Sequence, residues 1–146
     1  MVRDDASRWV IGFSRSIGKT NNFAAELWGL REGLLLYSNL NINALEVELD
    51  AKSIVDALGN PSYVNNVISP LLDDCKLLIS CILQVCIKHC FRQVNRCADS
   101  LVRMSYCLDA DFSTFDSPPV DLVDVVEDDL NGMVFNRVCS ENVAVS

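Results

Sequence analysis

The chain has 146 residues, of which 50% are hydrophobic and 22% are charged, and its formal net charge at pH 7 is −8. This length and balance suit one globular domain and exclude a chain that is disordered or fibrous throughout. An acidic balance also argues against non-specific binding of nucleic acid through bulk charge.

The excess negative charge belongs to the C-terminal end of the chain. Residues 1–103 contain 11 Asp or Glu and 11 Lys or Arg, whereas residues 104–146 contain nine acids and one base, Arg137. The first part is therefore neutral, and the acidic character of the sequence describes the second part alone.

Cysteine usage points to a reducing compartment. Four of the seven cysteines, Cys75, Cys81, Cys86 and Cys90, fall in the most hydrophobic stretch, and no two cysteines form a CxxC pair. This pattern predicts buried free thiols and no disulfide-linked partner. A disulfide framework or a zinc site stays open as the alternative, although a single His completes no recognisable ligand set.

The sequence shows no membrane signal. The N-terminus lacks an apolar signal core, and the longest apolar-rich run, Leu77–Ile87, is too short to span a bilayer. We therefore expect a soluble intracellular protein without a membrane partner, and the sequence does not distinguish the nucleus from the cytoplasm.

Periodicity predicts a strand, a helix and a second strand at the start of the chain. Apolar residues alternate over Arg8–Ile17, and residues 4–7 before it are typical of a hairpin turn. A helix begins at a cap on Asn21 or Asn22, because apolar residues then recur at helical spacing. Leu45–Asp50 reads LEVELD, which predicts a strand with one apolar and one acidic face.

Helices and strands continue to alternate up to about residue 108. The expected elements are a short helix over Ala51–Leu58, a helix from Ser69–Pro70 to about Cys81, a strand over Val85–Phe91, and a helix from about Asn95 to Leu108. The sequence Ser117-Pro118-Pro119 then marks a break. This order predicts an α/β domain over residues 1–107 and an acidic C-terminal tail, partly disordered, over residues 108–146.

Three acids lie where an α/β domain often places a site. Asp50 ends a predicted strand, Glu26 lies in the first turns of a predicted helix, and Asp99 lies near the start of the last one. Strand ends and helix starts around one sheet can converge in space. Acids near helix N-termini also interact favourably with the helix dipole, so a structural role for Glu26 and Asp99 remains the alternative.

The residues around these acids carry a family resemblance. The segments NNFAAELWGLREGL (Asn21–Leu34), LEVELDAKSIVDAL (Leu45–Leu58) and KHCFRQVNRCADSLVRM (Lys88–Met104) occur in this order. Together they resemble the reverse-transcriptase-like subclass of type 1 ribonuclease H domains in plant retroelement-derived proteins. The resemblance implies the ribonuclease H-like three-layer α/β fold, a mixed sheet flanked by helices.

The resemblance also implies a chemistry. In that family, two Mg²⁺ ions, with Mn²⁺ as an alternative, support endonucleolytic hydrolysis of the RNA strand of an RNA–DNA hybrid. Glu26, Asp50 and Asp99 would be metal ligands and catalytic residues, and the catalytic His89 would assist proton transfer or product departure. His89 as a partly exposed strand-end residue is the alternative.

The same resemblance names residues that would contact the nucleic acid. They are polar or basic side chains that flank the carboxylates, and they would bind phosphates and sugar hydroxyls. These residues are Asn22, Lys52, Arg92, Asn95 and Arg96. A solvated charged face explains the basic ones equally well.

The chain departs from its family at the first strand. The family carries a fourth carboxylate in an Asp-Gly motif there, and Asp4 and Asp5 match a later turn instead. We therefore expect a sheet that lacks the first strand and most of the second, and a weak or inactive hydrolase. The competing hypothesis is a non-catalytic interaction module that retains the scaffold. An upstream exon encoding a strand that ends in Asp-Gly-Ser or Asp-Gly-Ala would favour the enzyme.

Overall fold

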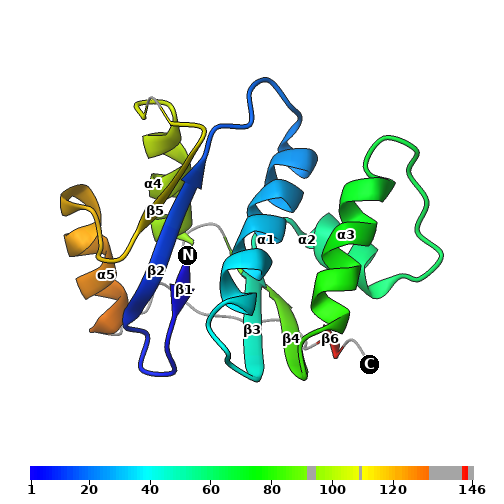
Figure 1. The fold of residues 1–146 in the computed structure, drawn as a ribbon, viewed down its shortest axis with the longest axis horizontal. Helices are drawn as coiled ribbons and strands as arrows, with labels where there is room; N and C mark the ends of the chain where they lie inside the picture. The colour runs from blue at the N-terminus through cyan, green and yellow to red at the C-terminus, as the bar shows by residue number, and fades with distance from the viewer. Residues whose placement is uncertain (92–94, 109, 132–142, 145–146) are drawn as a thin grey trace. The chain divides into compact units, whose positions relative to one another are not determined.

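The computed structural model describes residues 1–91, 95–108, 110–131 and 143–144 (Figure 1). The chain divides into two compact units. Unit 1 comprises Met1–Gly18 and Phe91–Arg137, and unit 2 comprises Lys19–Cys90 and Val138–Ser146. Each unit contains its own three-stranded sheet and its own helices.

Unit 1 is built on an antiparallel sheet in the order β1-β2-β5. Its elements are β1 (Val2–Arg3), β2 (Trp9–Arg15), α4 (Arg96–Ser105), β5 (Phe112–Phe115), the 3₁₀ helix η2 (Val120–Leu122) and α5 (Val123–Leu130). The register pairs Gly12 with Phe115 and Arg15 with Phe112. The turn predicted between β1 and β2 is present, with Asp4 Oδ1 accepting from the main-chain N–H of Ala6 at 3.0 Å.

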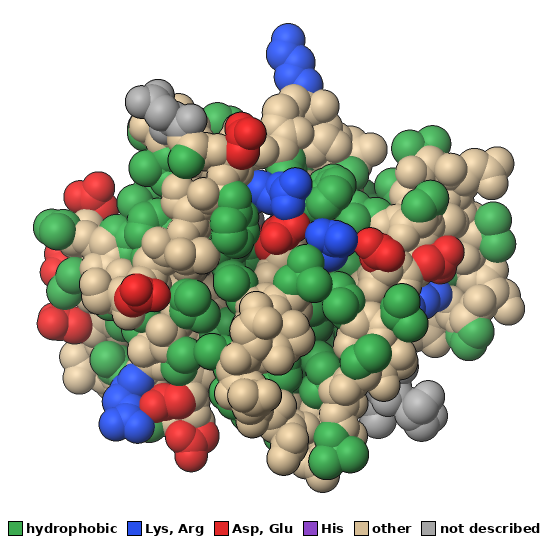
Figure 2. Space-filling view, in the orientation of Figure 1, with side chains coloured by type: hydrophobic (Ala, Val, Ile, Leu, Met, Phe, Trp, Pro, Cys, Tyr) green, Lys and Arg blue, Asp and Glu red, His purple; other side chains and the backbone are tan. Residues whose placement is uncertain are grey.

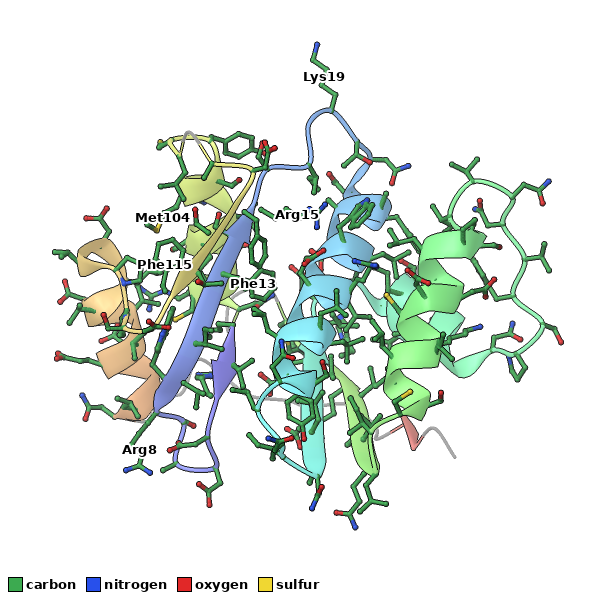
Figure 3. The ribbon with its side chains drawn as sticks, viewed as in Figure 1. Arg8, Phe13, Arg15, Lys19, Met104 and Phe115 are labelled. Atoms are coloured by element: carbon green, nitrogen blue, oxygen red, sulfur yellow. The ribbon has the colours of Figure 1, made fainter. Side chains whose placement is uncertain are left out.

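Specific side chains attach β5 and α4 to β2. The indole N–H of Trp9 donates to the carbonyl of Phe115 at 3.0 Å, and the rings of Phe13 and Phe112 stack at 6.2 Å. Figure 3 shows Phe13 and Phe115 on these neighbouring strands. The hydroxyl of the buried Ser14 donates to the carbonyl of Leu101 in α4 at 2.9 Å, so a core polar group is satisfied.

Unit 2 has a mixed sheet in the order β3-β4-β6. Its elements are α1 (Asn22–Ser38), β3 (Ala44–Leu49), α2 (Lys52–Gly59), α3 (Ser69–Ser80), β4 (Gln84–His89) and β6 (Val143–Ala144). β3 and β4 are parallel in register, and β6 is antiparallel to β4. Among the described residues, no strand pairs with the second edge of β3.

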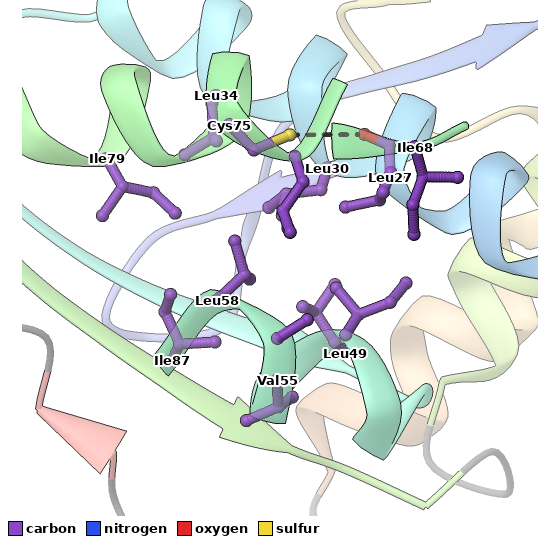
Figure 4. Close-up of a cluster of buried hydrophobic side chains, with 13 residues drawn as sticks. Leu27, Leu30, Leu34, Leu49, Val55, Leu58, Ile68, Cys75, Ile79 and Ile87 are labelled. Atoms are coloured by element: carbon purple, nitrogen blue, oxygen red, sulfur yellow. Dashed lines mark hydrogen bonds between the residues drawn. The ribbon is translucent and has the colours of Figure 1, made fainter. Parts of the chain in front are cut away.

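The core of unit 2 lies between its helices and the apolar face of β3 and β4 (Figure 4). It includes Leu27 and Leu30 of α1 together with Leu49 and Ile87 of the strands. The thiol of Cys75 donates to the carbonyl of Leu27 at 3.6 Å, and burial raises the pKa of this thiol to about 12. At the surface, Arg31 links α1 to α3 through its Nε and Asp74 Oδ2 at 3.0 Å.

The seven elements predicted before residue 108 are all present, with ends moved by a few residues. The thiol prediction needs one correction. Cys75 and Cys90 are buried free thiols as expected, whereas Cys81 is exposed because it caps the C-terminus of α3, and Cys86 is only half-buried. Within the described ranges, no helix is long and apolar enough to cross a membrane.

Candidate nucleic-acid and metal site

The C-terminal ends of β3 and β4 bring Asp50 and His89 together. The two strands are parallel and Leu49 pairs with His89, so both strands end at the same edge of the sheet. Asp50 follows β3 directly, and its main-chain oxygen lies 3.2 Å from Nε2 of His89. Both residues are half-buried. With Nε2 protonated, the imidazole donates to this carbonyl, which holds the ring beside the strand-end acid.

Glu26 lies at the same end of unit 2. Asn21 Oδ1 accepts from the main-chain N–H of Ala24 at 2.8 Å and caps the helix, which places Glu26 in its first turns. The connection from α1 to β3 is short, and the hydroxyl of Tyr37 donates to the carbonyl of Ile42 at 2.8 Å within it. Because α1 and β3 share one core and run in opposite directions, the start of α1 adjoins the end of β3 (Figure 1).

The N-terminus of helix α2 lies directly after Asp50. Its N-cap, Ala51, makes no side-chain hydrogen bond, and Ala51 is the residue after Asp50. A carboxylate just before a helix N-terminus interacts favourably with the helix dipole.

Asp99 belongs to unit 1, whereas Glu26, Asp50 and His89 belong to unit 2. It lies in the first turn of α4, half-buried, and its main-chain N–H donates to the carbonyl of Asn95 at 3.1 Å. The structure therefore groups Asp50, His89 and Glu26 at one end of one unit, and it places Asp99 in the other.

The donor set matches Mg²⁺ in chemistry but not in number. Hard divalent ions prefer carboxylate oxygens, and a pair of ions needs several carboxylates around a common point. Among the described residues, no group of three or more His, Cys, Asp and Glu side chains is placed to hold a metal ion. Neither unit by itself therefore brings together the ligands of a two-ion site among its described residues.

The expected nucleic-acid contacts divide between the two units. In unit 2, Asn22 and Lys52 begin α1 and α2 and are exposed, and Lys52 Nζ lies 3.5 Å from Asp56 Oδ1. In unit 1, Asn95 caps α4 without a side-chain cap bond, and Arg96 is the first residue of that helix. Arg92 lies outside the described residues.

One contact of these residues has no counterpart in the sequence prediction. Arg96 Nη1 lies 3.2 Å from Asp128 Oδ2, so α5 reaches the first residue of α4. The two residues are 32 positions apart, and the acidic segment that contains Asp128 has no sustained periodicity. The only available signal is the charge asymmetry between the first 103 residues and the rest.

Comparison with known proteins identifies the family. The family described as "Reverse transcriptase-like" matches residues 1–105. The chain belongs to this family. Its fold is therefore ribonuclease H-like, which confirms the resemblance inferred from the motifs of α1, β3 and α4, and the mixed α/β class. The described strands form two separate sheets, β1-β2-β5 and β3-β4-β6, and no described strand pairs with the edge of β3 that faces away from β4.

A relative of the reverse transcriptase-like chain occurs in Arabidopsis thaliana. It is named "Putative ribonuclease H protein At1g65750" and is 30% identical over 132 residues. The match covers 90% of this chain and 21% of the relative, so the chain spans about a fifth of the relative's length. No solved structure matches the chain.

Proposed function

We propose that this chain is a ribonuclease H-type domain that binds an RNA–DNA hybrid, and that residues 1–146 alone hydrolyse the RNA strand weakly or not at all. The observation that carries the proposal is the shared end of β3 and β4, where Asp50 and His89 meet beside the start of α1. Family membership supplies the substrate class, since the relative is named a ribonuclease H protein.

Binding would use polar groups at helix starts. Asn22 and Lys52 are exposed at the beginning of α1 and α2, and Asn95 and Arg96 stand at the beginning of α4. Helix N-termini attract anions because their first N–H groups lack intrahelical partners. These residues would hold phosphates and sugar hydroxyls, which suits recognition of a duplex by shape.

Hydrolysis would need more than the described donors. When bound, Mg²⁺ or Mn²⁺ would activate water and stabilise charge on the scissile phosphate. Glu26, Asp50 and Asp99 are the carboxylates that would hold such ions, and the imidazole of His89 would assist proton transfer. Weak hydrolysis is expected because the described residues bring no three such ligands together.

The test measures binding and cleavage separately. Fluorescence anisotropy with a labelled hybrid, compared with duplex DNA of the same sequence, measures affinity, and gel analysis with Mg²⁺ or Mn²⁺ measures cleavage. We expect preferential binding of the hybrid, and cleavage that is either absent or slow and abolished by Asp50→Asn. Asp73→Asn is the matched control, because Asp73 is an exposed acid on α3.

Three results would contradict the proposal. Equal affinity for the hybrid and for duplex DNA would contradict the RNA–DNA hybrid as the substrate class. Rapid cleavage by residues 1–146 would contradict the expected weak or absent hydrolysis. Cleavage that survives Asp50→Asn removes the role of that carboxylate.

A non-catalytic interaction module is the second candidate, and the unpaired edge of β3 among the described residues favours it. The discriminating experiment compares residues 1–146 with a version extended upstream by a strand ending in Asp-Gly. Cleavage gained by the extended version supports the enzyme. Absence of both cleavage and hybrid binding in both versions supports the module.

A further inference from the structure

We infer that α5 competes with nucleic acid inside the molecule, because Asp128 binds Arg96 at the start of α4, where a backbone phosphate of the hybrid would bind. The inference rests on the proposed function, since it concerns the regulation of that same nucleic-acid contact.

The contact is an ion pair that another anion can replace. Arg96 Nη1 lies 3.2 Å from Asp128 Oδ2, and the two side chains are 40% and 33% exposed. Partly solvated pairs of this kind contribute little to stability, so breaking one costs the fold little. A phosphate offers the guanidinium the same kind of charged oxygen that the carboxylate offers.

The position of the pair matches a place where an anion would bind. Arg96 is the first residue of the ten-residue helix α4, and Asn95 before it makes no side-chain cap bond. The N-terminus of a helix carries a partial positive charge. Asp128 therefore supplies a negative charge at a helix start whose adjacent side chains, Asn95 and Arg96, are proposed phosphate contacts.

The rest of α5 strengthens the competition. Leu122 and Val126 are buried and anchor η2 and α5 in unit 1, whereas Asp124 and Glu127 remain exposed. Residues 112–131 contain no Lys or Arg. Figure 2 shows acidic side chains gathered along the side formed by α5. An acidic helix fixed at this place repels a phosphate backbone while its own carboxylate holds Arg96.

The inference predicts a change in both affinity and salt dependence. Loss of the Asp128 charge removes the carboxylate that competes with a phosphate for Arg96. Each phosphate contact adds about 0.9 to the slope of log affinity against log salt concentration. Removal of general negative charge from another place in α5 weakens repulsion but adds no contact.

The experiment measures hybrid binding by anisotropy over a series of KCl concentrations. Asp128→Asn is compared with Asp124→Asn, which removes the same charge from an exposed position on the same helix. We expect Asp128→Asn to tighten binding by about two- to fivefold and to steepen the salt slope by about 1, with a smaller effect and no slope change for Asp124→Asn.

A double-mutant cycle separates this inference from the proposed function. In an Arg96→Gln background, Asp128→Asn should add no affinity beyond the effect of Asp124→Asn. Equal effects of the two acid variants, or a gain that persists without Arg96, would overturn the inference while hybrid binding by the unmodified chain stands. No hybrid binding by any variant would contradict the proposed function and the inference together.

The two acid variants must keep the fold of the unmodified chain for their affinities to be compared. Thermal unfolding of both acid variants shows whether either substitution weakens the fold itself.

Discussion

At Gly12, the ring of Trp9 occupies the space that a side chain would need. A Cβ built at Gly12 collides with the Cζ2 and Cη2 atoms of that ring. Gly29 offers the opposite case, because nothing lies within 4 Å of a Cβ built there, midway along α1. Alanine substitution at Gly12 therefore measures the cost of a steric clash, and alanine substitution at Gly29 measures the gain in helix propensity.

We expect Gly12→Ala to lower the free energy of unfolding by about 1–3 kcal/mol, because the indole must leave its position on β2. Gly29→Ala should raise it by about 0.5–1 kcal/mol, because alanine is favoured over glycine inside a helix. Urea unfolding of both variants measures the difference. A neutral Gly12→Ala would show that Trp9 does not pack on β2 in solution.

Cys75 allows a prediction of reactivity and pH dependence. Burial raises its pKa from 9.0 to about 12, so the thiolate fraction at neutral pH is about a thousandfold below that of an ordinary thiol. Iodoacetamide should label the exposed Cys81 and Cys107 first, as read by mass spectrometry. Rapid labelling of Cys75 in the folded chain would contradict its burial.

The sign of the pH effect follows from the same shift. Below pH 9 the thiol of Cys75 is protonated in both states and contributes no pH dependence. Between about pH 9 and pH 12 the unfolded chain loses this proton while the folded chain keeps it, so the free energy of unfolding falls. Cys75→Ala should show a smaller fall over that range.

At the scale of elements, successive main-chain N–H groups of β3 differ in whether they bond to a neighbouring strand. The main-chain oxygens of Asn43 and Leu49 accept from N–H groups of Gln84 and Cys90, so every second residue from 43 to 49 bonds to β4. The intervening residues, such as Glu46, direct their N–H groups to the other edge, where no described strand pairs.

Amide exchange can test this alternation. We expect Leu45 and Val47 to exchange slowly, because their N–H groups are directed toward β4, and Ala44 and Glu46 to exchange quickly. The protected neighbours in the same strand are the internal control. Strong protection of Glu46 would mean that another strand covers this edge in solution.

Most elements could be predicted because their periodicity was clear. The alternation of Leu45–Asp50 and the helical spacing after Asn21 follow directly from which faces are buried. β5, η2 and α5 could not be predicted, because β5 has only four residues and α5 is anchored by few apolar side chains. Their positions depend on pairing with β2 and packing in unit 1, which local sequence does not encode.

The candidate site was predictable only in part. Asp50 and His89 could be expected to meet, because parallel strands end at the same edge. The placement of Asp99 in a different unit from Glu26 depends on which strands pair, and no motif reveals that. The ion pair of Arg96 and Asp128 joins two partly exposed side chains that lie far apart in the sequence, so no periodic pattern in the sequence predicts it.

At the scale of the whole molecule, unit 1 depends on residues beyond the family match. β5 pairs with β2 and supplies the acceptor for the indole of Trp9, and the buried Leu122 and Val126 follow it. The family match ends at residue 105, before all of these residues. Part of the sheet and core of unit 1 is therefore formed by the acidic C-terminal tail, residues 108–146.

A chain ending at residue 108 tests this dependence and the predicted domain boundary. We expect the amides of β2 to lose protection in the shortened chain, because β5 and its hydrogen bonds are removed. The amides of α1 and α3 in unit 2 should keep theirs and serve as the control. Full protection of β2 in the shortened chain would support a domain complete at residue 107.

The two tryptophans of the chain fall one to each unit. Trp9 packs over Gly12 in unit 1, and Trp28 in unit 2 lies under the guanidinium of Arg31, whose Cζ is 5.6 Å from the ring centroid. Each unit thus contains its own intrinsic fluorophore, in a different local environment. With Trp28→Phe or Trp9→Phe, fluorescence reports on one unit at a time, and unfolding can be followed without attached labels.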